Sequence, residues 1–144
     1  MWLHPVISHR RRRANFRAVE EEVRYYHQLR KELAQRKQDI IEATDYAEVP
    51  VRTGPGNTVL AKVMQMRSSA VILETERRIA AVEYALQATK ARDESRFRMI
   101  TLKYFENRLT DEGIWLEIGI GRDTFYRWRR EFVELVAGRM GWEV

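Results

Sequence analysis

The stretch GIGRDTFYRWRREF, residues 119 to 132, places two glycines before a run of aromatic residues and four arginines. Its apolar side chains recur at helical spacing and extend to residue 135, at Phe125, Trp128, Phe132 and Leu135. This spacing predicts a helix with one buried face. The arginines of this helix either read DNA or only keep an amphipathic helix soluble. Both alternatives give the same pattern, so the preceding residues must decide between them.

Those residues complete the pattern of a helix-turn-helix. Thr110 is a good N-cap for a helix ending at Ile118, because its hydroxyl oxygen can accept from the free amides of the first turn. Gly119 can adopt the positive φ of a tight turn, and the second helix is predicted to start at Gly121 or Asp123. Apolar residues occupy the positions that the motif buries, which are 114, 118, 120, 125 and 128. This pattern favours a DNA-reading helix-turn-helix over the alternative, a surface corner of two helices.

The outward-facing side chains of the second helix are the predicted DNA contacts. Arginine paired with guanine is the commonest specific contact in the major groove. We expect Arg129 to lie nearer the phosphate backbone. The residues predicted to face the groove are Arg122, Asp123, Thr124, Tyr126, Arg127 and Arg130.

The rest of the chain is predicted to be helical, which gives an all-α fold. A long helix from Ala14 to Tyr46 and a second from Asn57 or Thr58 to Ala91 should form a long helical hairpin over residues 14–91, joined by a Gly/Pro-rich loop at 47–57. Residues 92–144 should form a three-helix DNA-binding unit whose first helix spans Ser95–Glu106 and stops at Asn107–Arg108. The last helix should end near Ala137. The apolar stripes of the long helices exceed what one chain can cover, so we expect a homo-oligomer through this hairpin.

The first thirteen residues contain the run HRRRR, with arginine at Arg10, Arg11, Arg12 and Arg13. This basic N-terminal arm either contacts DNA as a flexible segment or is a solvated chain end. The acidic run at residues 20–22 is interpreted as a solvated helical face.

Composition limits the function classes. The 144 residues carry a net charge of +5 and no cysteine, so disulfides and thiolate metal sites are excluded. No run approaches the roughly 20 apolar residues of a membrane span. No grouping of catalytic residues, nucleotide-binding loop or metal-ligand set is evident, so we expect no enzyme, no cofactor and no metal. These features predict a cytoplasmic protein.

Residues 98–137, RMITLKYFENRLTDEGIWLEIGIGRDTFYRWRREFVELVA, resemble the helix-turn-helix of sigma-factor region four. More specifically they resemble phage regulators of the RinA and ArpU type, and the likeness extends upstream over residues 22–90. The strongest similarity lies in LKYFENRLT and TFYRWRREF. The resemblance implies a transcriptional activator of a late phage operon, encoding packaging and structural proteins, that binds promoter DNA in the bacterial host cell. A direct contact with host RNA polymerase stays open. Two interpretations of the acidic residues Asp111, Glu112 and Glu117 stay open: they complement the helix dipole and aid solubility, or Glu117, with the polar face of the long helices, contacts polymerase.

Two positions depart from that family's pattern. Trp115 stands where alanine usually allows the two helices to cross closely. Either the crossing is wider, or the indole packs on the preceding helix around Tyr104. Gly121 replaces a capping serine, so the cap of the second helix either passes to Asp123 or is weaker.

Two alternative functions remain open. A phage small terminase subunit also joins a helix-turn-helix to oligomerising helices, but binds packaging-site DNA. A helical scaffold or RNA-polymerase-binding factor would use the C-terminal unit to meet protein. A promoter footprint favours the activator, a packaging-site footprint favours the terminase subunit, and no footprint favours the third class.

Overall fold

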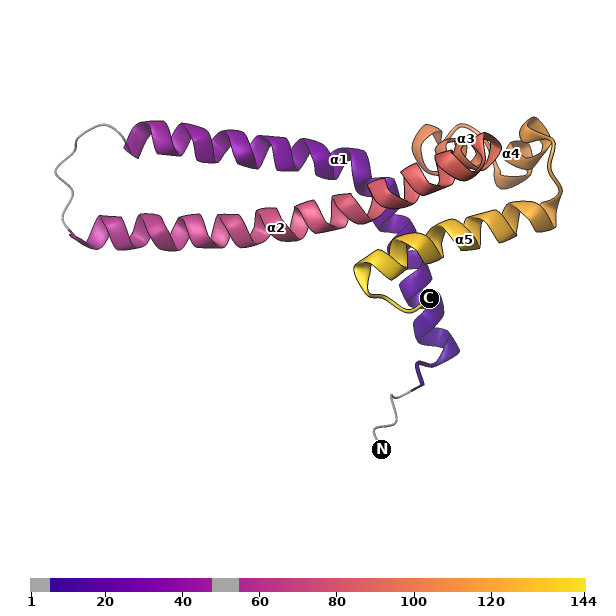
Figure 1. Ribbon diagram of the computed structural model, residues 1–144, viewed down its shortest axis with the longest axis horizontal. Coiled ribbons are helices and arrows are strands. Elements are labelled where there is room, and N and C mark those ends of the chain that lie inside the picture. The colour runs from indigo at the N-terminus through magenta and orange to yellow at the C-terminus, as the bar shows by residue number, and fades with distance from the viewer. Residues whose placement is uncertain (1–5, 48–54) are drawn as a thin grey trace. The chain divides into compact units, whose positions relative to one another are not determined.

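The computed structural model describes the backbone of residues 6–47 and 55–144, and the side chains of residues 6–43 and 69–144. All regular structure in these ranges is helical, without a strand (Figure 1), which confirms the all-α prediction. No helix in the same ranges is long and apolar enough to cross a membrane. The elements are α1 (His9–Ala47), α2 (Pro55–Arg92), α3 (Glu94–Thr101), the π-helical turn η1 (Leu102–Glu106), α4 (Asp111–Ile118) and α5 (Arg122–Met140).

Helix α1 begins at His9, before the predicted start at Ala14. Ser8 caps it: the Ser8 hydroxyl oxygen accepts a hydrogen bond from the Arg11 amide at 3.3 Å, and the Ser8 carbonyl accepts one from the Arg12 amide at 3.0 Å. Arginine is a good helix former, so the arginine run continues the helix once it is capped. Arg10 to Arg13 are therefore helical, and the description of this run as a flexible arm is corrected.

Helix α2 also begins earlier than predicted, at Pro55 instead of Asn57 or Thr58. Proline suits the first helical position, because its missing amide hydrogen would have no partner there and its φ is already helical. The remainder of the predicted loop, residues 48–54, lies outside the described residues.

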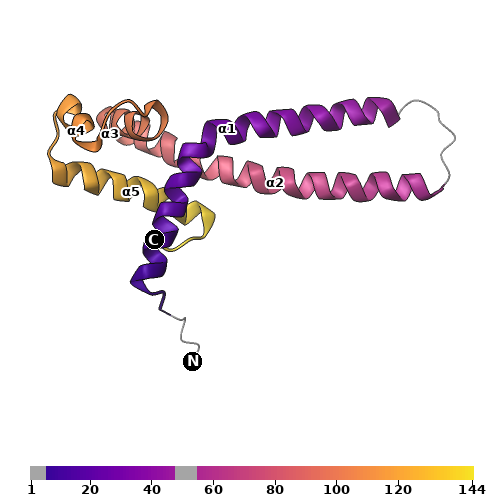
Figure 2. The ribbon, with the colours of Figure 1, turned by 180° about the vertical axis from the view of Figure 1, so that it is seen from behind.

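The chain divides into two compact units, one of Met1–Tyr26 with Ala80–Val144 and one of His27–Ile79. This division differs from the predicted boundary between residues 91 and 92. The reason is that the beginning of α1 and the end of α2 contribute apolar side chains to the core around the C-terminal helices. In the second unit, segments of α1 and α2 run antiparallel as a hairpin (Figures 1 and 2), with a surface ion pair between Lys37 and Glu76 at 2.9 Å.

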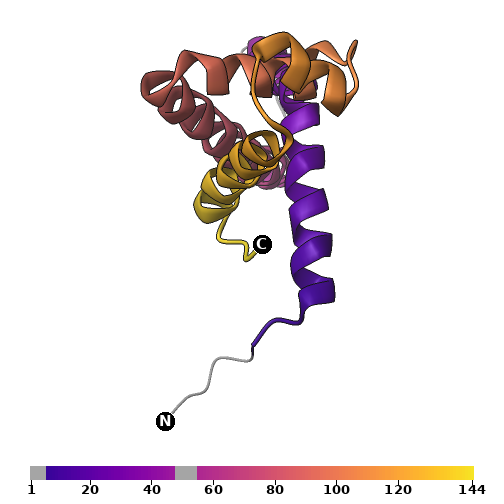
Figure 3. The same ribbon diagram turned by 90° about the vertical axis from the view of Figure 1, so that its right-hand side faces the viewer.

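The core of the first unit draws on every helical element. The beginning of α1 crosses α5 in this unit (Figure 3). Core side chains exposed by 2% or less are Val19, Val23, Val82, Ala85, Met99, Ile100, Tyr104, Ile114, Phe125, Phe132, Val133, Val136 and Ala137. The helix-turn-helix thus packs against α1, α2 and α3.

The ends of the helices around α4 are set mainly by residues close to them in the sequence. The Asp93 carboxylate accepts a hydrogen bond from the Ser95 amide at 2.8 Å, so α3 starts one residue before the predicted Ser95. Asn107 follows η1, where the helix was predicted to stop, and its φ is +53°. Asparagine tolerates this left-handed conformation better than most residues. Helix α5 runs to Met140, beyond the predicted end at Ala137.

Candidate nucleic-acid interface

Helices α4 and α5 form the two arms of the predicted helix-turn-helix. The Thr110 hydroxyl oxygen accepts a hydrogen bond from the Gly113 amide at 3.1 Å, which confirms Thr110 as the N-cap of α4. Gly119 ends α4 with φ at +82°, a value that a residue with a side chain rarely adopts. The amides of Gly119 and Ile120 both donate to the Trp115 carbonyl at 3.0 Å. The turn therefore closes within three residues, and α5 starts at Arg122.

Trp115 packs on the first turn of α5. Its ring lies 5.6 Å from that of Phe125 and 6.2 Å from that of Tyr126, in edge-to-face geometry. These ring contacts differ from one of the two alternatives, in which the indole packs around Tyr104. Because the ring faces α5, it fills the space between α4 and α5. A smaller residue at this position would let the two backbones approach each other. Gly121 is the N-cap of α5 without a side-chain cap, and Asp123 lies inside the first turn instead of capping it.

The predicted contact residues fall into three groups by exposure. Arg122, Asp123, Arg127 and Arg130 are exposed, Thr124 and Tyr126 are half-buried, and Arg129 is turned toward the core. The Arg122 guanidinium lies 5.7 Å from the centre of the Tyr126 ring, which orients both side chains near the N-terminus of α5. Asp123, Arg127 and Arg130 are spaced by four and three residues, so they share one solvent-facing stripe.

Arg129 differs from the prediction because its guanidinium is committed to a buried carboxylate. It donates to Glu20 of α1 at 2.7 and 3.0 Å, and the Tyr104 hydroxyl donates to the same carboxylate at 2.7 Å. The Glu20 side chain is only 4% exposed and that of Arg129 26%. This bidentate pair joins α1 to α5 and gives Arg129 a structural role in place of the predicted backbone contact.

The interpretation of residues 20–22 as a solvated face is wrong for Glu20, which is 3% exposed, while Glu21 is exposed. Burial alone would raise the pKa of Glu20, but the hydrogen bonds from Arg129 and Tyr104 outweigh it and lower the pKa below 4.5. Burial and the neighbouring Glu20 charge raise the pKa of Tyr104. Glu20 therefore stays ionised and Tyr104 stays protonated at neutral pH. The burial of Glu20 could have been predicted from its spacing. It follows Phe16 by four residues and precedes Val23 by three, so it lies on the apolar stripe of the helix.

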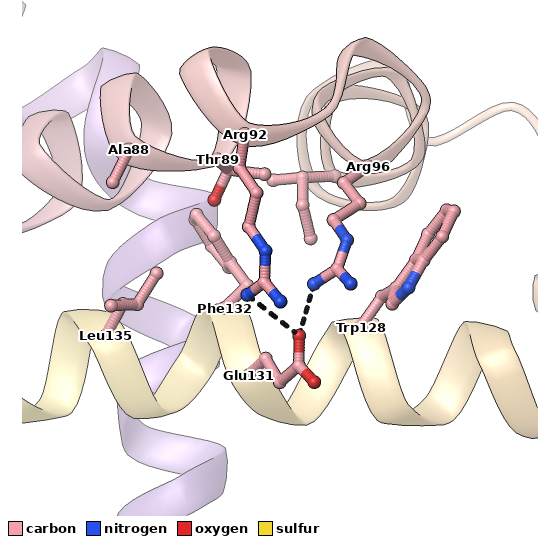
Figure 4. Close-up of a pocket in the computed structure, with 9 residues that line it drawn as sticks. Ala88, Thr89, Arg92, Arg96, Trp128, Glu131, Phe132 and Leu135 are labelled. Atoms are coloured by element: carbon pink, nitrogen blue, oxygen red, sulfur yellow. Dashed lines mark hydrogen bonds and ion pairs between the residues drawn. The ribbon is translucent and has the colours of Figure 1, made fainter.

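Trp128 and Glu131 of α5 face the other way, toward α2 and α3 (Figure 4). They line a pocket of about 170 Å³ in which the Arg96 guanidinium lies 5.0 Å from the centre of the Trp128 ring. Glu131 pairs with Arg96 and, at 3.6 Å, with Arg92. These contacts hold the side of α5 that carries Trp128 and Glu131. The stripe of Asp123, Arg127 and Arg130 faces solvent.

Two of the acidic residues before the turn, Asp111 and Glu117, have ion-pair partners. Asp111 pairs with Lys103 at 2.8 Å. Glu117, the candidate polymerase contact, lies 3.4 Å from Arg98 and 3.5 Å from Arg108. These ion pairs provide a structural reason for both carboxylates.

The arginine run of α1 meets α5 on one part of this surface. Arg13 and Arg17 of α1 lie beside Arg130 and Tyr126 of α5, and the four side chains line one open pocket. The spacing of Arg13 and Arg17 by one helical turn was visible in the sequence, but their proximity to α5 depends on the crossing of the two helices.

Comparisons of the chain with models of known protein families, with curated proteins and with solved structures find no match.

Proposed function

We propose that the chain is a sequence-specific DNA-binding protein that reads the major groove with α5. The observation that carries this proposal is the exposed stripe of Asp123, Arg127 and Arg130 on α5, the second helix of a helix-turn-helix whose inner side buries Phe125 and Phe132. Arginine at such positions recognises guanine through two parallel hydrogen bonds. In keeping with the resemblance to phage regulators, we propose that the DNA is a promoter and that the protein activates a late operon.

Footprinting on phage DNA tests the biological role. Protection of a promoter supports activation. Protection of a packaging site would replace this function by that of a small terminase subunit. The absence of any footprint would contradict both DNA-binding functions. It would favour the third class, a helical scaffold or a factor that binds RNA polymerase.

Arg127 provides the sharpest test of sequence reading by α5. It is exposed and has no ion pair with any described residue, so Arg127→Ala should leave the melting temperature unchanged. The variant should bind a duplex selected from a random library with about 1–3 kcal/mol less free energy, and lose discrimination at one base pair. Arg36→Ala is the matched control, because Arg36 is an equally charged exposed residue of the second unit. Equal losses for the two variants would show that only net charge matters.

We also propose that the second unit, His27–Ile79, mediates self-association. Three of its large apolar side chains are exposed: Ile41 by 56%, Val71 by 41% and Leu73 by 65%. Light scattering at micromolar concentration should give a dimer or a larger assembly. In a dimer, two α5 helices about 34 Å apart would meet successive major grooves. A monomeric mass over the whole concentration range would contradict self-association.

A further inference from the structure

The crossing of α1 and α5 forms a basic pocket of about 390 Å³, open to solvent. We call it the α1–α5 pocket. Three of its six lining residues come from α1 and three from α5: Arg13, Phe16, Arg17, Tyr126, Arg129 and Arg130. Four of the six are arginines, and none is acidic.

The partners of these residues determine which groups are available to a ligand. Arg129 is held by Glu20 and its guanidinium lies 5.1 Å from the centre of the Phe16 ring. The Tyr126 ring contacts Trp115 and Arg122. Arg13, Arg17 and Arg130 are exposed and form no ion pair with the residues that the structure describes. The pocket therefore offers three guanidinium groups, while its aromatic rings already have neighbours.

Three guanidinium groups around one opening favour an anion with several acceptor oxygens. Each guanidinium has five N–H donors in a planar fork, which matches the oxygens of a phosphate group. The position of the pocket identifies the source of the phosphate. Arg130 lines the pocket and follows Arg127 by three residues, so the pocket adjoins the stripe that we propose to read DNA.

We propose that the α1–α5 pocket binds a phosphate group of the DNA backbone beside the major groove read by α5. This inference rests on the proposed function and adds α1 to the DNA interface. The Glu20–Arg129 pair and the Tyr104 hydroxyl fix α1 against α5, so Arg13 and Arg17 are held in place before DNA binds. Pre-organised contacts cost less conformational entropy on binding than those of a flexible arm.

The helical geometry makes the arginines of α1 unequal. Arg13 and Arg17 are one turn apart and face the pocket. Arg11 precedes Arg13 by two residues, which places it on about the opposite face of the helix. A flexible arm would instead use the arginines of the run interchangeably.

The experiment compares two double variants with the same loss of charge. Arg13→Ala/Arg17→Ala removes the pocket arginines, and Arg11→Ala/Arg36→Ala removes two exposed arginines outside it. Binding of each to a short random-sequence duplex is measured over a range of salt concentrations. The pocket variant should reduce the slope of log affinity against log salt by about 0.9 for each phosphate that the variant no longer binds. The control variant should keep the slope of the unchanged protein.

The outcomes separate this inference from the proposed function. Identical slopes for the two double variants, with specificity still lost in Arg127→Ala, would overturn the phosphate pocket and keep DNA reading by α5. A reduced slope for the pocket variant, with no preference of the unchanged protein for any sequence, would keep the pocket and overturn sequence reading. An unchanged protein that binds no duplex would overturn both. Arg13→Lys/Arg17→Lys retains the charges and should recover most of the slope. If the pocket double-alanine variant unfolds, the affinity of the double-lysine variant for the duplex tests the pocket instead. That affinity should be lower than that of the unchanged protein, because lysine lacks the bidentate fork.

Discussion

Glu20→Gln is expected to lower the free energy of unfolding by about 3 kcal/mol, because it leaves the Arg129 guanidinium without its carboxylate in a largely buried site. This value is the lower end for a buried pair, since the Arg129 side chain retains 26% exposure. The Tyr104 hydroxyl also loses a charged acceptor. Urea denaturation of the variant and the unchanged protein measures the difference.

Glu21→Gln is the matched control. Glu21 is the next residue along α1, its side chain is 74% exposed, and it pairs with Arg24 on the surface. Such a pair contributes about 0–1 kcal/mol. A loss of the same small size for both variants would show that the Glu20 network does not hold α1 to α5. Replacing Glu20 and Arg129 together by apolar residues of similar volume should recover much of the stability, because no unpaired charge remains buried.

The pH dependence follows from the lowered pKa of Glu20. A carboxyl group whose pKa is lower in the folded state than its ordinary 4.5 stabilises the fold above pH 4.5, and this contribution is lost as pH falls through the folded value. The stability difference between the unchanged protein and Glu20→Gln should therefore be constant from neutral pH down to about 5 and shrink at lower pH. A difference that grows on acidification would contradict this sign.

Phe125→Ala should lower the free energy of unfolding by about 3–5 kcal/mol, the usual cost of removing a buried phenyl ring. Phe125 is 0% exposed. Its ring lies 5.6 Å from that of Trp115 and 5.3 Å from that of Tyr126, so its loss leaves a cavity between α4 and the first turn of α5. DNA binding should fall with it, because the orientation of α5 depends on this contact.

Leu116→Ala on α4 serves as the control for Phe125→Ala. Leu116 is 69% exposed, and substitutions at such positions usually change stability by less than about 0.5 kcal/mol. Thermal or urea unfolding of both variants provides the comparison. A loss below about 1 kcal/mol for Phe125→Ala would mean that the turn alone orients the two helices.

The elements that were predictable from sequence are those set by local chemistry. Thr110 caps α4, Gly119 turns the chain and Asn107 ends the preceding helix because each needs only its own backbone and near neighbours. Helical periodicity likewise identified the buried side of α5 at Phe125 and Phe132.

The parts that were not predictable depend on residues far apart in the chain. Glu20 and Arg129 are separated by 109 positions, so no local pattern shows that they pair, even though Glu20 lies on the apolar stripe of α1. The α1–α5 pocket has the same origin, since Arg13 and Arg130 meet only through the crossing of two helices. The packing of Trp115 on Phe125 depends on how α4 and α5 cross, which the sequence left open.

The central claim, sequence-specific reading of DNA by α5, is tested most directly by one ratio. A duplex is selected for tight binding from a random library, and its dissociation constant is compared with that of a random duplex at the same salt concentration. Specific DNA-binding proteins prefer their sites by about a thousandfold or more, so the unchanged protein should reach that ratio. A ratio near one, with no enriched sequence, would contradict the claim.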